Sequence, residues 1–202
     1  VAKSNNYVRP LVDDSYIIDI KEGRHPVIEK QLKMGEAYIA NDVYLDNESQ
    51  QVIMITGPNM SGKSAILRQT ALIALLAQMG SYVPANEYIY NPYNKILCKI
   101  SSVDNIYESK SKFIQDITHM NMFIENADDK TLLLVDEFLN STEEYSAAAL
   151  TAASINELIN KKSNFVYTSH INSIIDLLKD NKQIKFKHFD YKIIENNIKL
   201  IS

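Results

Sequence analysis

Three short, continuously apolar segments dominate the hydrophobic pattern of the chain. They are Gln51–Thr56 (QVIMIT), Thr131–Glu137 (TLLLVDE) and Asn164–His170 (NFVYTSH). Runs of this length and composition are typical of strands that are buried on both faces of a parallel sheet. Shorter β-like runs predict further strands at Tyr16–Ile20, Ala37–Leu45 and Asn94–Ile100.

Helical segments are predicted between the strands. One runs from Lys63 to about Met79 and is followed by Gly80 in the position of a C-terminal cap. A second covers Lys110–Ala127, where apolar residues fall on one side of a helix: Phe113, Ile117, Met120 and Ile124. Two more are expected at the Ala-rich segment Tyr145–Asn160 and at Ile171–Leu178.

The tail, from Ile184 onward, alternates well enough to predict two antiparallel strands with Asn196–Asn197 at the turn. Strands that alternate with helices indicate an α/β fold with a largely parallel central sheet, flanked by helices and accompanied by an antiparallel β portion. Ligands of such sheets bind beyond the carboxyl ends of the strands, where polar residues cluster in this sequence.

The segment Gly57–Ser64 (GPNMSGKS) fits the pattern G-x-x-x-x-G-K-[ST] between a predicted strand and a predicted helix. In a P-loop NTPase the glycines permit a tight loop, the lysine reaches the β- and γ-phosphates, and the hydroxyl ligates Mg²⁺. These roles fall to Lys63 and Ser64. A chance match in a chain of this length is on the order of one in a hundred, which disfavours a mere helix-capping turn.

Polar residues at the ends of the other two buried strands complete the expected chemistry. Asp136 is expected to hold Mg²⁺, and Glu137 to orient or deprotonate the attacking water, although a pair of acids at a strand end is common by itself. His170 is expected to hydrogen-bond a γ-phosphate, the alternative being a structural histidine. Asn59 can reach the γ-phosphate or merely shape the loop. His25, His119 and His188 show no metal-ligand spacing and are interpreted as structural.

Length and composition set broad limits on the protein. Its 202 residues suffice for one well-buried domain, and a net charge of -4 argues against a wide basic face that coats nucleic acid. The single cysteine, Cys98, is expected to be a buried structural thiol in a reducing compartment. We expect an intracellular protein without membrane segments, cytoplasmic if bacterial and nuclear if eukaryotic. Because there is no initiator methionine, a fragment of a longer protein is also expected.

Several segments, in this order, resemble the ATPase domain of the MutS DNA mismatch-repair proteins. They are GRHPVIE (Gly23–Glu29), YIANDVYL (Tyr38–Leu45), Ile55–Ala85 (ITGPNMSGKSAILRQTALIALLAQMGSYVPA), SKFIQDI (Ser111–Ile117) and LLLVDEF (Leu132–Phe138). The resemblance extends from about Ile17 to the tail. It implies one ABC-type ATPase head over residues 1–202, with a β-rich lead-in over 1–46 that carries adenine-side contacts and a P-loop core over 47–202.

The resemblance also implies functional residues. ATP and Mg²⁺ would be held by the loop residues Gly57, Pro58, Asn59, Met60, Ser61, Gly62, Lys63 and Ser64, with Asp136 on the metal. Lys63, Glu137 and His170 would serve hydrolysis. Tyr38 would stack on adenine beside Ile39, the alternative being an ordinary strand aromatic. Ser111 would reach the nucleotide of the partner subunit in a dimer; a helix N-cap is its alternative.

The segment after Asp136–Glu137 departs from the family pattern. The family usually has Leu-Gly-Arg-Gly-Thr-Ser-Thr there, while this chain has Phe138-Leu-Asn-Ser-Thr-Glu-Glu144. Losing glycines removes backbone freedom, and two added acids would repel a triphosphate. Lys112 stands where a threonine is usual and Asp116 where a glutamate is usual.

Two functional hypotheses follow. The favoured one is a mismatch-repair ATPase head that couples its ATP state to a DNA clamp, with DNA bound by domains absent from this chain. It would form a homo- or heterodimer through the ATPase face. Mismatch-repair proteins are expected as further partners, and a membrane is not. The alternative is a weakly or non-hydrolysing paralogue that uses ATP as an assembly switch in recombination. A small-molecule kinase would need an Arg-rich lid, which the sequence lacks. Mismatches and branched junctions both remain open as the DNA target.

Overall fold

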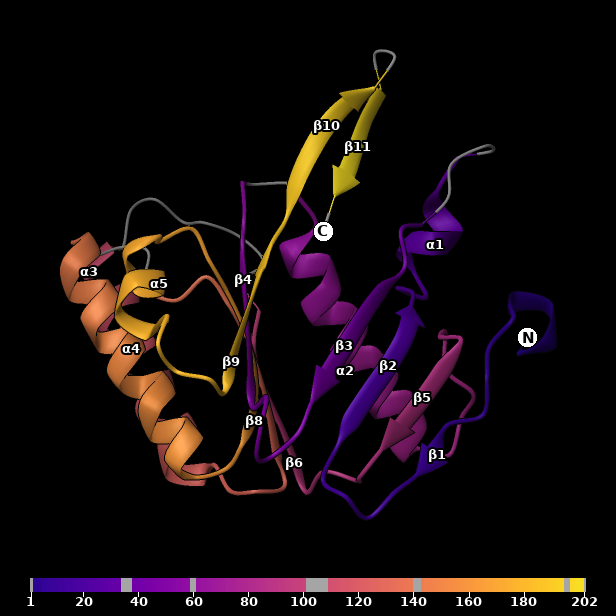
Figure 1. Cartoon of the computed structure of the whole chain (residues 1–202), viewed down its shortest axis with the longest axis horizontal. Helices are drawn as coiled ribbons and strands as arrows, with labels where there is room; N and C mark the ends of the chain where they lie inside the picture. The colour runs from indigo at the N-terminus through magenta and orange to yellow at the C-terminus, as the bar shows by residue number, and fades with distance from the viewer. Residues whose placement is uncertain are drawn as a thin grey trace.

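The computed structural model describes residues 2–33, 38–58, 61–100, 109–139, 143–194 and 197–201, with the backbone alone for 109–111, 190–194 and 197–201. A five-stranded parallel sheet forms its centre (Figure 1). Its order is β6 (Lys95–Lys99), β7 (Thr131–Asp136), β8 (Asn164–Ser169), β4 (Val52–Thr56) and β9 (Ile184–His188). Every residue of β4, β7 and β8 is buried, so the three apolar runs are the inner strands, as predicted.

Helices cover both faces of this sheet. On one face lies α2 (Lys63–Gln78), which packs on Ile53, Ile55 and Leu134. On the other face lie α3 (Ser109–Asn126), α4 (Glu144–Asn160) and α5 (Ser173–Leu178). Gly80 has φ 77° and its N–H donates to Ala77 O at 2.9 Å, which confirms the predicted C-terminal cap of α2. The expected α/β fold with a parallel sheet flanked by helices is confirmed.

A second sheet packs on the far side of α2 and supplies the expected antiparallel portion. Its order is β1 (Leu11–Val12), β5 (Glu87–Tyr90), β2 (Ile18–Gly23) and β3 (Asn41–Leu45), and only the β1–β5 pair is parallel. The sequence did not predict β5, nor the short helices η1 (Lys3–Asn5) and α1 (Ile28–Gln31). Because β5 comes from the middle of the chain, this sheet combines residues from both sides of position 46.

The interpretation of the tail was wrong in part. Only β10 (Asp190–Ile194) and β11 (Asn197–Ile201) form the antiparallel hairpin, which projects beyond the body of the molecule (Figure 1). The preceding segment, β9, instead extends the central sheet parallel to β4. An edge strand with outward lysines alternates in the same way as a hairpin strand, so the pattern could not separate the two. Asn196 lies outside the described residues.

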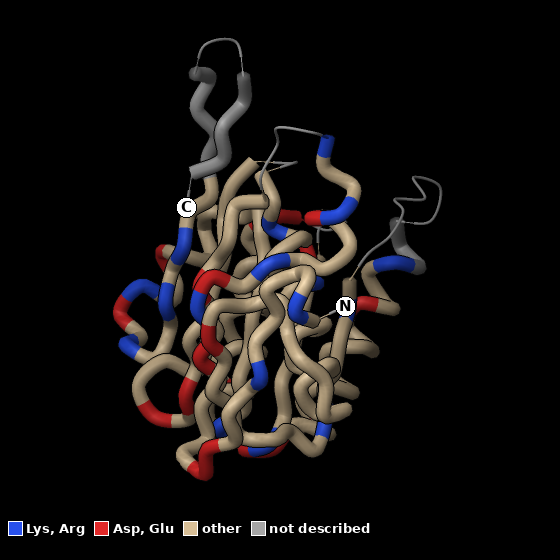
Figure 2. Tube along the Cα trace, turned by 90° about the vertical axis from the view of Figure 1, so that its right-hand side faces the viewer, with Lys and Arg blue, Asp and Glu red and all other residues tan. Residues whose placement is uncertain are grey.

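The structure also shows how charged residues, the single cysteine and apolar helices are distributed. Lys and Arg are intermingled with Asp and Glu along the chain trace (Figure 2). Cys98 is exposed, so the prediction of a buried thiol was wrong. It lies on β6, whose single neighbouring strand among the described residues is β7. Within the described ranges, no helix combines the length and apolar character that crossing a bilayer requires.

Candidate active site

The loop after β4 is shaped by two glycines with positive φ. Gly57 has φ 147°, and a Cβ atom there would lie 2.2 Å from the carbonyl oxygen of Phe189. Gly62 has φ 96° and its carbonyl accepts from the N–H groups of Ala65 and Ile66 at 3.0 and 3.1 Å, which starts α2. The strand, the described residues of the loop and the helix therefore adopt the arrangement that the motif predicts.

Lys63 is buried inside this loop, with 3% of its side chain exposed. Its Nζ donates to the carbonyls of Gly57 at 2.7 Å and Pro58 at 2.8 Å. Burial lowers the pKa of the Lys63 ammonium, while the charges of Glu137 and Asp136 act in the opposite direction. Ser61 Oγ is buried and has no hydrogen-bond partner among the described residues. A buried ammonium and, two residues before it, a buried hydroxyl without a partner among the described residues fit the phosphate groups of a nucleotide.

The two acids at the end of β7 are held by β8. Asp136 is 4% exposed, and its Oδ1 accepts a hydrogen bond from Thr168 Oγ1 at 2.5 Å. The N–H of Glu137 donates to both the carbonyl and the hydroxyl of Thr168, each at 3.2 Å. The sequence analysis did not predict a role for Thr168. The pairing register of the parallel strands β7 and β8, which places Thr168 opposite Asp136, could have indicated it.

Glu137 joins the loop lysine to the histidine after β8. Its Oε1 contacts His170 Nε2 and lies 3.9 Å from Lys63 Nζ. The side chains of Glu137 and His170 are 27% and 32% exposed, so a ligand in the loop can reach them. Three residues from widely separated segments, predicted as catalytic, therefore lie together at the carboxyl ends of three neighbouring strands.

The predicted Mg²⁺ ligands are a hydroxyl and a carboxylate. Ser64 is the second residue of α2, and Asp136 ends β7. No group of three or more His, Cys, Asp or Glu side chains that could hold a metal ion occurs within the described ranges. Mg²⁺ commonly binds through one or two protein oxygens together with water and substrate phosphates, so Ser64 and Asp136 fit such a site.

Of the two predicted adenine-side residues, Tyr38 contacts α2. Tyr38 donates a hydrogen bond from its hydroxyl to Gln69 Oε1 at 2.9 Å, and burial, with a smaller contribution from Glu29, raises its pKa to about 12. Ile39 is 42% exposed. Tyr38 thus contacts the helix that begins at the phosphate loop, while its stacking on adenine stays a prediction.

Other predicted residues are described only in part. Asn59 and Met60 lie outside the described residues. Ser111 is the third residue of α3, so the alternative that it caps this helix is wrong, and its side chain is outside the description. Of the histidines interpreted as structural, His25 accepts from the N–H groups of Val27 and Ile28 at 3.3 and 3.2 Å. His188 Nδ1 lies 3.0 Å from Thr56 Oγ1, where it supports the end of β4.

Comparison with known proteins identifies the family. A model of MutS domain V matches residues 53–202. The chain belongs to the MutS family. Proteins named DNA mismatch repair protein MutS from Phocaeicola vulgatus, Bacteroides fragilis and Bacteroides thetaiotaomicron are 45%, 43% and 42% identical to it over 201 residues. These matches cover 98% of this chain and 23% of each relative, so the chain spans about a quarter of their length.

MutS domain V is an ABC-type P-loop ATPase domain. The fold and the loop described above agree with this assignment.

The segment that departs from the MutS pattern has a structural role. Glu143 caps α4, because its carboxylate accepts from the N–H groups of Tyr145 at 3.1 Å and Ser146 at 3.0 Å. Glu144 accepts from Ser173 Oγ of α5 at 3.0 Å. Both added acids are thus engaged in contacts of α4, and their repulsion of a triphosphate stays a prediction. Residues 140–142 lie outside the description.

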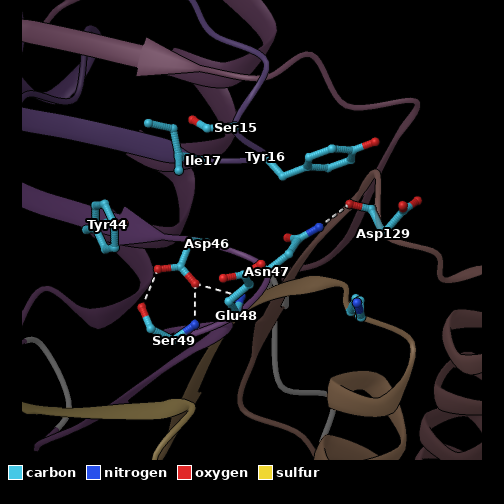
Figure 3. Close-up of a pocket in the computed structure, with 10 residues that line it drawn as sticks. Ser15, Tyr16, Ile17, Tyr44, Asp46, Asn47, Glu48, Ser49 and Asp129 are labelled. Atoms are coloured by element: carbon cyan, nitrogen blue, oxygen red, sulfur yellow. Dashed lines mark hydrogen bonds between the residues drawn. The ribbon is translucent and has the colours of Figure 1, made fainter.

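A polar pocket of about 450 Å³ lies at the amino ends of the parallel strands (Figure 3). The loop between β3 and β4 supplies Asp46, Asn47 and Ser49, and Asp46 accepts hydrogen bonds from Ser49 and from the Glu48 N–H. None of the residues predicted to bind nucleotide lines this pocket. The predicted site lies at the opposite end of the same strands.

Proposed function

We propose that this chain is the ATP-binding and ATP-hydrolysing head of a MutS-like DNA mismatch-repair protein. Its ATP state would control a DNA clamp formed by parts of the protein outside this chain. The observation that carries the proposal is the cluster of Lys63, Glu137 and His170 beyond the carboxyl ends of β4, β7 and β8. The names of the relatives support the repair role.

ATP would bind with its β- and γ-phosphates inside the loop Gly57–Ser64. Lys63 Nζ would exchange two loop carbonyls for phosphate oxygens, and in this buried place its charge interacts strongly with them. The hydroxyl of Ser61, which has no partner within the description, gains one. Mg²⁺, held by Ser64 and Asp136, would neutralise charge on the β- and γ-phosphates.

Hydrolysis would depend on Glu137 and His170. Glu137 accepts the proton of the attacking water, whose oxygen bonds to the γ-phosphorus as the bond to the β-phosphate oxygen breaks and ADP leaves. His170 would donate a hydrogen bond to the γ-phosphate. The contact between Glu137 Oε1 and His170 Nε2 supports this arrangement, because it keeps both side chains beside Lys63.

A second copy, or a related subunit, would complete the site. Ser111 of that subunit would contact the nucleotide, while Tyr38 and Ile39 hold the adenine from within the chain. Tyr38 is already fixed against α2 by its hydrogen bond to Gln69, which supports a preformed base site.

The alternative function is an assembly switch that binds ATP and hydrolyses it weakly or not at all. One observation favours it: Leu139 has φ 59° at a position where the family usually has glycine. Replacing Leu139, Asn140 and Ser141 with Gly-Arg-Gly separates the two functions. A large gain in ATP turnover would support the assembly switch. Unchanged turnover would remove the reason for proposing it.

Calorimetric binding of Mg·ATP tests the proposal directly. Lys63→Ala should weaken ATP binding by about 100-fold or more, because it removes the charge that faces the phosphates. Lys95→Ala is the matched control, since Lys95 lies at the amino end of β6, and it should leave the affinity unchanged. Unchanged affinity in Lys63→Ala would contradict the assignment.

A further inference from the structure

A buried ion pair links the carboxyl end of β6 to α3. Lys99 Nζ lies 2.8 Å from Asp116 Oδ1, and the two side chains are 13% and 3% exposed. Breaking a buried pair leaves an uncompensated charge, so such pairs fix the elements that carry them.

The same carboxylate reaches the segment that follows Glu137. Asp116 Oδ2 accepts a hydrogen bond from the N–H of Leu139 at 3.0 Å. Lys99 Nζ lies 5.1 Å from the centre of the Phe138 ring, within the range of a cation–π contact. The Lys99–Asp116 pair therefore contacts both Phe138 and Leu139, the two residues that follow Glu137.

This segment has an unusual backbone. Glu137 has φ 48° and Leu139 has φ 59°, although neither is glycine. Residues keep such conformations only where their surroundings enforce them. Thr168 holds the segment at the Glu137 N–H, and Asp116 holds it at the Leu139 N–H. If the second contact is lost, the Glu137 carboxylate loses its fixed position relative to Lys63 and His170.

We propose that Asp116 is a positioning residue for ATP hydrolysis. It fixes the Leu139 amide and thereby places the Glu137 carboxylate for the attacking water, while Lys99 holds the Asp116 carboxylate in position. This inference rests on the proposed function, and it adds a residue that acts on the reaction without contact to the nucleotide.

Steady-state hydrolysis separates positioning from mere stabilisation. Asp116→Asn should lower kcat by about 10- to 100-fold, the range expected when a charge-assisted contact of a catalytic segment is lost. The ATP dissociation constant should change by less than about twofold, since the phosphate loop is untouched. Asp116→Glu should keep most of the wild-type kcat, because it keeps the carboxylate. Glutamate is also the residue that the family usually has at this position.

Two further variants sharpen the comparison. Lys99→Gln keeps a hydrogen-bond donor for Asp116 but removes the charge, so it should lower kcat in the same direction, by about 3- to 10-fold. Asp128→Asn is the matched control, because the Lys95–Asp128 pair has the same 2.8 Å distance at the other end of β6. It should leave kcat unchanged.

Amide hydrogen exchange gives a readout that needs no hydrolysis. Asp116→Ala should speed exchange of the Leu139 amide by about tenfold or more, because its acceptor is gone, and leave that of Val135 in β7 unchanged. Equal exchange of Leu139 in both proteins would overturn the proposal. So would an unchanged kcat in Asp116→Asn, or a fall in kcat that only matches a loss of folded protein or of ATP affinity. If the wild-type chain hydrolyses no ATP, the proposed function fails, while hydrogen exchange still tests the placement of Leu139.

Discussion

A single methyl group added at Gly57 tests the geometry of the phosphate loop. Both Gly57 and Gly80 have positive φ, 147° and 77°, so alanine is strained at either position. Only Gly57 is also crowded. An added Cβ would lie 2.2 Å from Phe189 O, whereas nothing lies within 4 Å of the Cβ added at Gly80.

The crowding at Gly57 cannot be relieved by a side chain. Ordinary contact begins at 3.4 Å, so the carbonyl of Phe189 would have to retreat by more than an ångström. That backbone is held in place, because the Phe189 N–H donates to Thr56 O at 2.8 Å. The strained φ should cost about 1–2 kcal/mol at either glycine, and the overlap about 1–3 kcal/mol more at Gly57.

Urea unfolding and calorimetric ATP binding measure the two effects. Gly80→Ala should lower the free energy of unfolding by about 1–2 kcal/mol and leave ATP affinity unchanged. Gly57→Ala should lower it by about 2–5 kcal/mol and also weaken ATP binding, since relief of the clash displaces the loop. Equal losses of stability in the two variants, with ATP affinity intact in both, would refute this reasoning.

Three further predictions concern individual residues. Lys162→Gly should raise the free energy of unfolding by about 1 kcal/mol, because Lys162, which follows α4, has φ 58°. Lys161→Gly should lower the free energy of unfolding, because Lys161 has φ -80°. Urea unfolding of both variants shows whether the two effects have opposite signs. Tyr38→Phe should weaken ATP binding about fivefold by removing the bond to Gln69 but leave tripolyphosphate binding unchanged; equal losses for both ligands would contradict a role at the base. Leu139→Gly should be at least as stable as Leu139→Ala in thermal unfolding, because glycine relieves the φ of 59°; a clearly less stable glycine variant would argue against that strain.

Much of the fold could be predicted from local sequence pattern. The inner strands β4, β7 and β8 are buried on both faces, so their sequences are continuous apolar runs that need no knowledge of their neighbours. Helix α2 was bounded correctly by the phosphate loop and by Gly80. Strand β5 could not be found this way, because four residues with two tyrosines form too short a pattern.

The candidate site was likewise predictable from the sequence only in part. The loop Gly57–Ser64 is a local motif, so its strand–loop–helix setting followed from the sequence. The contacts of Thr168 with Asp136 and of Asp116 with Leu139 join residues 32 and 23 positions apart, and no spacing rule predicts such pairs. In the sequence Asp116 differs from the family pattern but gives no sign of its partners, because Lys99 lies on β6 and Leu139 follows β7.

The most direct test of the proposed function is the Mg²⁺-dependent rate of ATP hydrolysis per chain, measured as the chain concentration rises, with Glu137→Gln alongside. We predict a specific rate that climbs with concentration, because a second copy supplies Ser111, and that vanishes in Glu137→Gln while ATP still binds. A flat rate near zero in the wild-type chain, with ATP bound, would contradict hydrolysis and favour the assembly switch.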